Sequence, residues 1–383
     1  MAPQENHPRP TEIRALAGAR ALPPLLLVLY HYHEAHGYQN VRWFDVFVSK
    51  GYLWVEFFFA LSGFILVHVC SARLQFRYFE FLKARLSRLY PLHLFTLLWM
   101  LAMVVIFRWL AAMGGYTSIY DLPGYHPYTS AWSFIGNLFL VQAWHVFPRL
   151  TWNGVSWFVS VEWSLCLIFP LYLWIARQRA WAGVALIVFG LLLLRWLIQP
   201  KIGLDITYDW GILRGMADFS VGVGLAMIYR SLRDRAETWP DAWHTLAQLL
   251  AFATFFYAVY ATGWAHTMRD YWMLPPMFAI VLVLAFDRGF IARIFQSAPL
   301  RLLGEWSFAI YMGQTTFLQV LRVAEQQLYP NPAPQWRATI HLLEPAAMVI
   351  LCIAWGALLY YVVERPASEW LRRHWSAQPG GTE

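Results

Sequence analysis

Charged residues and cysteines are both scarce in this chain of 383 residues. Charged side chains make up 13% of it, against about 25% in an average soluble domain. No polar stretch is long enough for a separate soluble domain. The three cysteines, Cys70, Cys166 and Cys352, lie in apolar segments at unrelated spacings. They indicate neither a disulfide framework nor a metal site, and the histidines show no ligand spacing either. We therefore predict no bound metal.

The chain is rich in apolar and aromatic residues. Hydrophobic residues make up 59% of the chain and aromatic residues 18%. Runs of about 20 apolar residues, the length that crosses a bilayer as a helix, follow one another closely. The sequence thus predicts an all-α integral membrane protein with about ten spans. These are expected near 15–34, 51–71, 91–112, 155–176, 181–199, 210–230, 244–264, 272–290, 305–327 and 340–363.

The distribution of arginine and lysine gives the topology, because basic residues gather in cytoplasmic loops. With the N-terminus inside, eighteen basic residues fall in inside segments and seven in outside ones. This count requires that the short apolar stretch 134–147 does not span, so we expect it to re-enter or to lie in the interface. Both termini are then cytoplasmic. The predicted parts are a tail at 1–14, one transmembrane domain at 15–363 and a tail at 364–383.

The net charge of +7 does not indicate nucleic-acid binding, because most of the basic residues lie in short loops between the predicted spans, where they set the membrane topology. The expected surroundings are membrane lipid, in a multi-pass membrane protein. The N-terminus has no short apolar core followed by a small-residue cleavage site, so the first apolar run is read as an uncleaved helix rather than a signal peptide.

Two ionisable residues, Arg20 and His31, lie within the first predicted span. In a continuous helix, eleven positions would leave them about 20° apart in azimuth and about 16 Å apart along the axis. Ionisable groups within a bilayer are costly and usually mark a site. The pair Pro23-Pro24 lies between them, and since proline removes a donor and clashes one turn back, a kink there would change this alignment.

Further ionisable residues lie within other predicted spans. Glu56 and Glu162 are expected near the depth of His31, where carboxylates could orient the imidazole as a general base. A structural ion pair is the alternative for each. Arg214 lies one turn from Asp218, so the two could simply neutralise one another.

A basic amphipathic segment, 73–91, precedes the third predicted span. Arg85 and Arg88 are three residues apart and share one helix face, which we expect at the cytoplasmic surface. Two adjacent guanidinium groups suit phosphate oxygens. The alternative is a topogenic loop that grips anionic lipid.

These features together resemble the bacterial membrane-bound acyltransferase family 3. The resemblance rests on seven short motifs, in the family's order, over almost the whole chain. They are Arg20-x10-His31, Phe-Phe-x-Leu-Ser-Gly-Phe at 58–64, Arg-x-x-Arg-Leu-x-Pro at 85–91, Ser156-Trp with Ser160-Val-Glu162, Arg214-x4-Phe219-x2-Gly222, Ser307-x3-Tyr311 and Glu364-Arg-Pro366.

The resemblance implies an enzyme of the bacterial inner membrane. Such enzymes move an acyl group, usually acetyl, from cytoplasmic acyl-CoA onto a hydroxyl of a saccharide, which can be lipid-linked. By position, Arg20, Arg85 and Arg88 match residues associated with the donor. Arg214 is a further candidate for binding it. His31 would be the general base, with Glu162 and Glu56 as catalytic carboxylates.

The chain departs from the family pattern in three places. Members often carry Tyr-Leu-x-His in the penultimate helix, where this chain has Tyr311-Met-Gly-Gln314. Glu56 stands where aspartate is common. Many members carry a C-terminal hydrolase-like domain, whereas this chain is expected to be a stand-alone form.

Several alternatives remain open at this point. The acceptor could be a small molecule such as a macrolide, or a lipid, rather than a glycan. Transfer could be direct or pass through an acyl-histidine. From another class of function, ten helices with buried charges would also suit a transporter or flippase.

Overall fold

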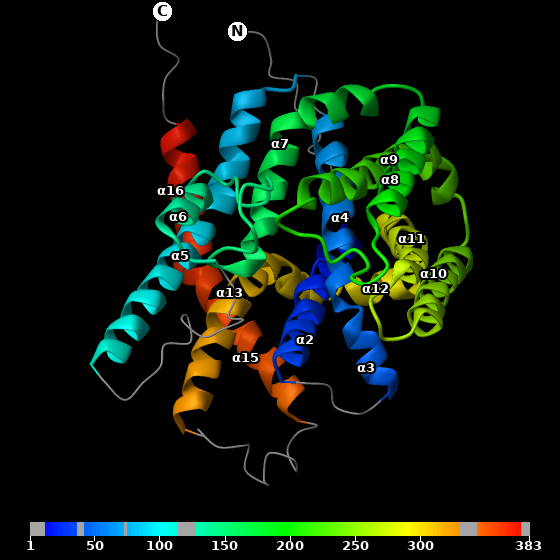
Figure 1. Cartoon of the computed structure of the whole chain (residues 1–383). Helices are drawn as coiled ribbons and strands as arrows, with labels where there is room; N and C mark the ends of the chain where they lie inside the picture. The colour runs from blue at the N-terminus through cyan, green and yellow to red at the C-terminus, as the bar shows by residue number, and fades with distance from the viewer. Residues whose placement is uncertain (1–11, 37–41, 73–74, 114–127, 329–342, 377–383) are drawn as a thin grey trace, which may run out of the picture.

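The computed structural model describes residues 12–36, 42–72, 75–113, 128–328 and 343–376 (Figure 1). Within these ranges every regular element is helical, and two isolated β-bridges are the sole strand-like pairings. Eight helical segments in this part of the chain are long and apolar enough to cross a membrane. The prediction of an all-α membrane protein is therefore confirmed, whereas the count of ten spans stays a prediction.

The first half of the chain forms seven α-helices and two short 3₁₀-helices in the described residues. They are α1 (Arg14–Ala19), α2 (Leu22–His36), α3 (Arg42–Ser49), η1 (Gly51–Leu53), α4 (Trp54–Ser71), α5 (Tyr78–Ala112), α6 (Ala131–Leu138), η3 (Gly154–Ser156) and α7 (Trp157–Ala176). The second half contributes α8 (Ala180–Leu197), α9 (Gly211–Glu237), α10 (Asp241–Thr262), η4 (Met268–Met273), α11 (Leu274–Ala285), α12 (Phe290–Phe295), α13 (Ala298–Leu328), α15 (Glu344–Leu359), η5 (Tyr360–Glu364) and α16 (Arg365–Ser376).

The eight membrane-length segments match eight of the ten predicted spans. The other two predicted spans, 15–34 and 305–327, correspond to α1 with α2 and to α13. Figure 1 shows α16 ending, and α5 beginning, at the top of the view, while α2 and α13 end at the bottom. The chain thus presents two opposite faces, as the predicted topology requires.

Two helices form the centre of the fold. Of the most apolar window of each, 72% is buried for Trp43–Ser71, which contains α4, and 78% for α9, against 22% for α5. A glycine lets α4 and α9 approach closely, because a Cβ on Gly222 would lie 1.9 Å from the carbonyl oxygen of Ala60. Small residues at such contacts are typical of membrane helices.

The first predicted span is interrupted next to its proline pair, Pro23 and Pro24. α1 ends at Ala19 and α2 begins at Leu22. Neither Pro23 nor Pro24 has an N–H to donate to the preceding turn, so the helical ladder stops there. The expected interruption is therefore present, and the alignment computed for one straight helix does not apply to Arg20 and His31.

Two segments differ from their predicted form, and a third, 134–147, agrees with the prediction that it does not span. α5 starts at Tyr78, so Arg85 and Arg88 belong to the long helix rather than to a surface segment before it, and Pro91 lies inside that helix. Residues 365–376, expected in the C-terminal tail, form α16. The stretch 134–147 gives only the end of the eight-residue helix α6, about 12 Å long, followed by turns, so it does not span.

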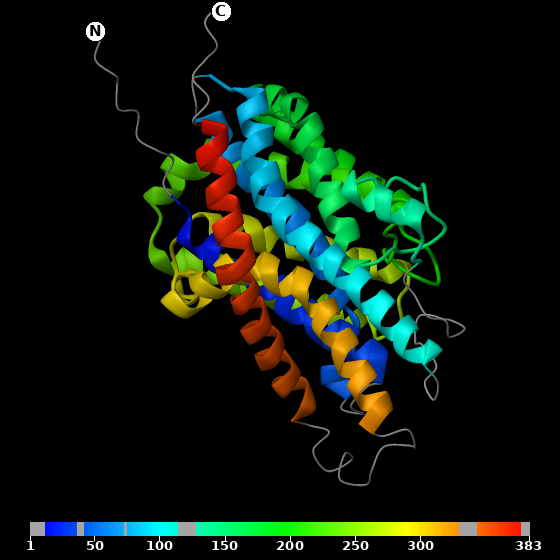
Figure 2. The same cartoon turned by 90° about the vertical axis from the view of Figure 1, so that its left-hand side faces the viewer.

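Figure 2 shows α16, α5 and α13 running side by side along one face of the molecule. α13 also contacts α1, α2 and α15. A Cβ on Gly304 of α13 would lie 2.0 Å from the carbonyl oxygen of Ala17, so this glycine permits the close approach of α1. That approach brings Arg20 next to α13. Residues from the described parts of both predicted tails, Glu12 and Glu364 among them, line one cavity with Arg20 and Gly304. Residues 1–11 and 377–383 lie outside the described residues.

Candidate active site

Three cavities follow one another through the described part of the bundle. The widest, here called the vestibule, has a volume of about 480 Å³ and is mostly polar. Its lining includes Arg20, Arg88, Arg301, Glu364 and Arg372, from α1, α5, α13, η5 and α16. Since three of these elements are remote in sequence from the first two, only the folded bundle assembles this cavity.

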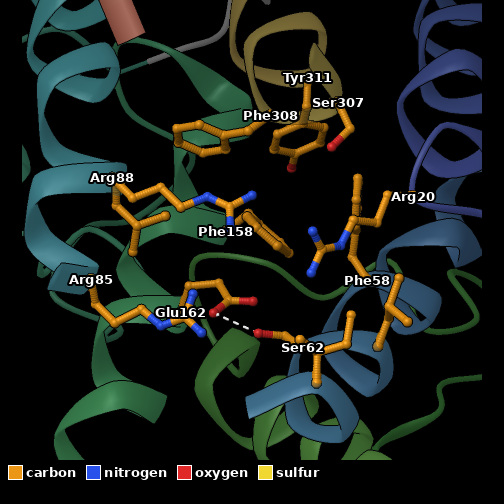
Figure 3. A pocket seen from close by; sticks show the side chains of 13 residues that line it. Arg20, Phe58, Ser62, Arg85, Arg88, Phe158, Glu162, Ser307, Phe308 and Tyr311 are labelled. Atoms are coloured by element: carbon orange, nitrogen blue, oxygen red, sulfur yellow. Dashed lines mark hydrogen bonds between the residues drawn. The ribbon is translucent and has the colours of Figure 1, made fainter. Parts of the chain in front are cut away.

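The second cavity, the arginine pocket, is narrow, with a volume of about 80 Å³. It shares Arg20 and Arg88 with the vestibule. The polar side chains that line it are Arg20, Ser62, Arg85, Arg88, Glu162, Ser307 and Tyr311. In Figure 3, Arg20 reaches in from one side, and Arg85 and Arg88 reach in from the opposite side. The two cavities are therefore neighbours with two arginines at their junction.

In the part of the chain that the structure describes, no close ion pair neutralises the three arginines of this pocket, and the one carboxylate that lines it is that of Glu162. All three are half-buried, and within the described residues no hydrogen bond or ion pair joins Arg20, Arg85 or Arg88 to another side chain. Arg85 lies 5.8 Å from the ring centroid of Phe81, a cation–π contact. Guanidinium groups that converge without partners repel one another and are costly away from water. Such an arrangement is favourable when an anion occupies the space between them.

The carboxylate of Glu162 faces the same pocket. Glu162 is 7% exposed, and Ser62 donates a hydrogen bond to its Oε2 over 3.1 Å (Figure 3). One carboxylate offsets part of the charge of three arginines and leaves a positive excess. Glu162 therefore belongs to the arginine pocket.

The third cavity, the histidine pocket, has a volume of about 220 Å³. His31 lines it, together with aromatic and polar side chains that include Tyr30, Tyr52, Trp157 and Thr315. Tyr311 lines this cavity and the arginine pocket alike. The histidine pocket thus continues the series on the far side of Tyr311.

A hydrogen bond from α13 fixes the ring of His31. The Nε2 amide of Gln314 donates to the carbonyl oxygen of Tyr311 over 3.1 Å, which turns its Oε1 towards His31 Nδ1, at 3.2 Å. Because an amide oxygen only accepts, Nδ1 must carry the hydrogen. The neutral ring then keeps a free lone pair on Nε2, the atom that a general base uses.

Glu56 and Arg214 form a buried ion pair between α4 and α9. Arg214 Nε and Nη2 donate to the two carboxylate oxygens, each over 2.9 Å. Arg214 also donates to the carbonyl oxygens of Ile206 and Tyr52, and both members of the pair are 1% exposed or less. Although Arg214 borders the histidine pocket, its donors are occupied by protein groups, so it does not join the arginine pocket.

The structure therefore separates residues that were expected together. His31, Glu56 and Glu162 do not meet: Gln314 contacts the histidine, Arg214 holds Glu56, and Ser62 holds Glu162. Arg20 and His31 line different cavities, in keeping with their expected separation along the first span. By contrast, Arg20, Arg85 and Arg88 do converge, although inside the bundle instead of at its surface.

Comparison with known proteins decides the family. Residues 13–363 match the family model described as an acyltransferase domain. The chain belongs to the acyltransferase family 3. It is 27% identical over 401 aligned positions to the acyltransferase MdmB of Streptomyces mycarofaciens, covering 96% of this chain and 94% of that protein. It is 34% identical over 161 positions to protein 2 in the picA locus of Rhizobium radiobacter, covering 41% of this chain and 76% of that protein. No solved structure matches.

In this multi-pass membrane acyltransferase, the structure identifies two candidate site residues, Tyr311 and Gln314, that the sequence alone did not select. Tyr311 was noted as part of a motif, and Gln314 was noted as a departure from the family's histidine. Their spacing of three residues places both on one face of α13, which is a signal visible in the sequence. What the sequence could not show is that this face meets α2 at His31.

Proposed function

We propose that this acyltransferase transfers an acyl group, usually acetyl, from acyl-CoA to a hydroxyl of a saccharide at the bacterial inner membrane. The vestibule and the arginine pocket would bind the donor from the cytoplasmic side. The histidine pocket would bind the acceptor from the outer side, and His31 would act as the general base.

The observation that carries this proposal is the convergence of Arg20, Arg85 and Arg88 on one pocket that a single carboxylate, Glu162, lines, with Arg20 and Arg88 at the junction of two cavities. Acyl-CoA supplies several phosphate groups, and guanidinium groups bind phosphate oxygens with paired hydrogen bonds. The wide vestibule suits the nucleotide end of the donor, and the narrow arginine pocket suits its slender pantetheine arm. Glu162, held by Ser62, would limit the positive excess and keep the arginine side chains in place.

The chemical step follows from the state of His31. Its Nε2 takes the proton from the acceptor hydroxyl as the hydroxyl oxygen attacks the thioester carbonyl carbon. A C–O bond forms and the C–S bond breaks, which releases the CoA thiolate. The thiolate then takes up the proton from His31, so the products are an ester and free CoA. Gln314 holds the ring in the required tautomer throughout.

The lining of the histidine pocket supports a saccharide acceptor. Tyr30, Tyr52 and Trp157 offer aromatic faces on which sugar rings stack, and Thr315 offers a hydroxyl for hydrogen bonds. The guanidinium of Arg214 is already bound to Glu56, which makes this pocket less suited to an anionic group than the arginine pocket. A free or lipid-linked saccharide fits these features.

Binding of acetyl-CoA to the purified protein tests the donor site. The double variant Arg85→Ala with Arg88→Ala should bind at least about 100-fold more weakly, since each lost hydrogen bond to a charged group is worth about 1.5–3 kcal/mol. Lys83→Ala is the matched control, because Lys83 lies on the same helix, is exposed and lines none of the three cavities. Unchanged affinity in the double variant would return both arginines to a role in topology or lipid binding.

A further inference from the structure

We propose that Tyr311 is the partition between the donor and acceptor sides, and that its ring sets the length of acyl chain that reaches His31. This inference rests on the proposed function and adds a determinant of donor specificity. It also assigns Tyr311 a second task, which is to keep water of the acceptor side away from the thioester.

The position of Tyr311 is the first argument. It is 2% exposed, yet it lines the arginine pocket and the histidine pocket alike. Arg85 and Glu162 border only the first of these two cavities, and His31 borders only the second. A thioester that arrives through the arginine pocket must therefore pass the ring of Tyr311 before it reaches the base.

The contacts of Tyr311 are the second argument. Its ring packs edge-on against Phe158, with centroids 5.3 Å apart, and against Phe58, with centroids 6.0 Å apart. Its hydroxyl donates a hydrogen bond to the carbonyl oxygen of Val155 over 3.0 Å. Both phenylalanines line the arginine pocket, and Val155 lines the histidine pocket. The ring thus closes an aromatic wall, and one hydrogen bond to η3 holds it closed.

The wall explains how one enzyme can keep a reactive thioester in a membrane with water on both sides. With the ring closed, water in the histidine pocket does not reach the donor. With the ring turned aside, a short acyl group passes through the space that the ring vacates. A longer acyl chain needs more room than one turned tyrosine leaves.

The first test measures donor specificity in the full-length protein with acetyl-CoA and hexanoyl-CoA. Tyr311→Ala should raise the ratio of kcat/KM for hexanoyl-CoA over acetyl-CoA by at least tenfold, since each methylene accommodated by an apolar pocket is worth about tenfold or more. It should also raise hydrolysis of acetyl-CoA without acceptor. Tyr311→Phe keeps the ring but loses the hydrogen bond to Val155, so it should keep a ratio near that of wild type while hydrolysis rises less than in Tyr311→Ala.

Phe308→Ala is the matched control, because Phe308 lies one turn away on the same helix and lines the arginine pocket but not the histidine pocket. It widens the donor side without opening the wall, so its ratio should stay near that of wild type. A wild-type ratio in an active Tyr311→Ala variant, or an equal rise in Phe308→Ala, would overturn the proposal.

A second test does not depend on turnover, so it separates failure of this inference from failure of the proposed function. Single cysteines replace Ile65, which lines the arginine pocket, or Leu150, which lines the histidine pocket, after Cys70, Cys166 and Cys352 are changed to Ala. A membrane-impermeant maleimide is added on the side from which position 150 reacts. Position 65 should stay unlabelled with Tyr311 present and react once Tyr311→Ala is added. Labelling of position 65 that does not change with Tyr311→Ala would contradict the partition, whatever the activity assays give.

Discussion

At the scale of single residues, the site divides its tasks among side chains that do not touch one another. In the proposed mechanism, three converging arginines attract an anion, and one histidine, hydrogen-bonded to Gln314, accepts a proton. The ion pair of Glu56 with Arg214 is a structural contact by comparison, because the Glu56 carboxylate accepts from Arg214, and Arg214 also donates to two backbone carbonyl oxygens. A buried charge alone therefore does not identify a functional residue. A charged side chain that forms no close ion pair is the better candidate.

Gln314 gives a prediction at this scale. Gln314→Met removes the acceptor for His31 Nδ1 and should lower kcat about five- to tenfold, since one neutral hydrogen bond is worth about 1 kcal/mol. KM for acetyl-CoA should change little, because Gln314 does not border the arginine pocket. Gln314→Glu restores an acceptor and should recover most of kcat. A change confined to KM in the methionine variant would argue against the positioning role.

Several of these residues were visible in the sequence, and their partners were not. Arg20, Arg85 and Arg88 could be selected because charged residues in apolar segments are costly. Glu162 was paired with His31 from estimated depth alone. Depth along a helix axis does not give the direction of a side chain, and the two groups face different cavities.

At the scale of helices, two local features determine where these side chains point. The break between α1 and α2 leaves Arg20 at the end of one helix and His31 in the next, and the two line different cavities. The glycine contact between α4 and α9 brings Glu56 within reach of Arg214. Hydropathy located most of the membrane-length helices, although it placed the start of α5 at 91 instead of Tyr78. The register between neighbouring helices depends on such contacts, and a single sequence does not record them.

The contact of α4 with α9 gives a second prediction. Glu56→Gln leaves the buried guanidinium of Arg214 without a counter-charge and should destabilise the protein by about 3–5 kcal/mol. The double variant Glu56→Met with Arg214→Met should regain much of this loss, which thermal unfolding in detergent would measure. Binding of acetyl-CoA per folded molecule should stay unchanged in both. Loss of donor binding without loss of stability would instead make this pair part of the donor site.

At the scale of the whole molecule, the three cavities form a route from one face of the bundle towards the other. The vestibule is built partly by α16, whereas the histidine pocket is built by α2, η1 and η3. Under the proposed function, such a route would let a large polar donor stay on one side of the membrane while its acyl group reaches an acceptor on the other.

The orientation of this route gives a third prediction. Gln178, between α7 and α8, should be cytoplasmic, and Lys201, between α8 and α9, should be external, since the basic loops place them so. Both are exposed. An impermeant maleimide applied to intact cells should therefore label Lys201→Cys and leave Gln178→Cys unlabelled. The reverse pattern would invert the assignment of donor and acceptor sides.

The most direct test of the account compares binding with transfer in the same variant. Purified wild type and His31→Ala are given radiolabelled acetyl-CoA, and the label passed to surface glycan from cells that lack the protein is counted. The account predicts that His31→Ala binds acetyl-CoA as tightly as wild type and transfers at least about 100-fold less label, the usual contribution of a general base. Transfer by His31→Ala at a rate near that of wild type would contradict it.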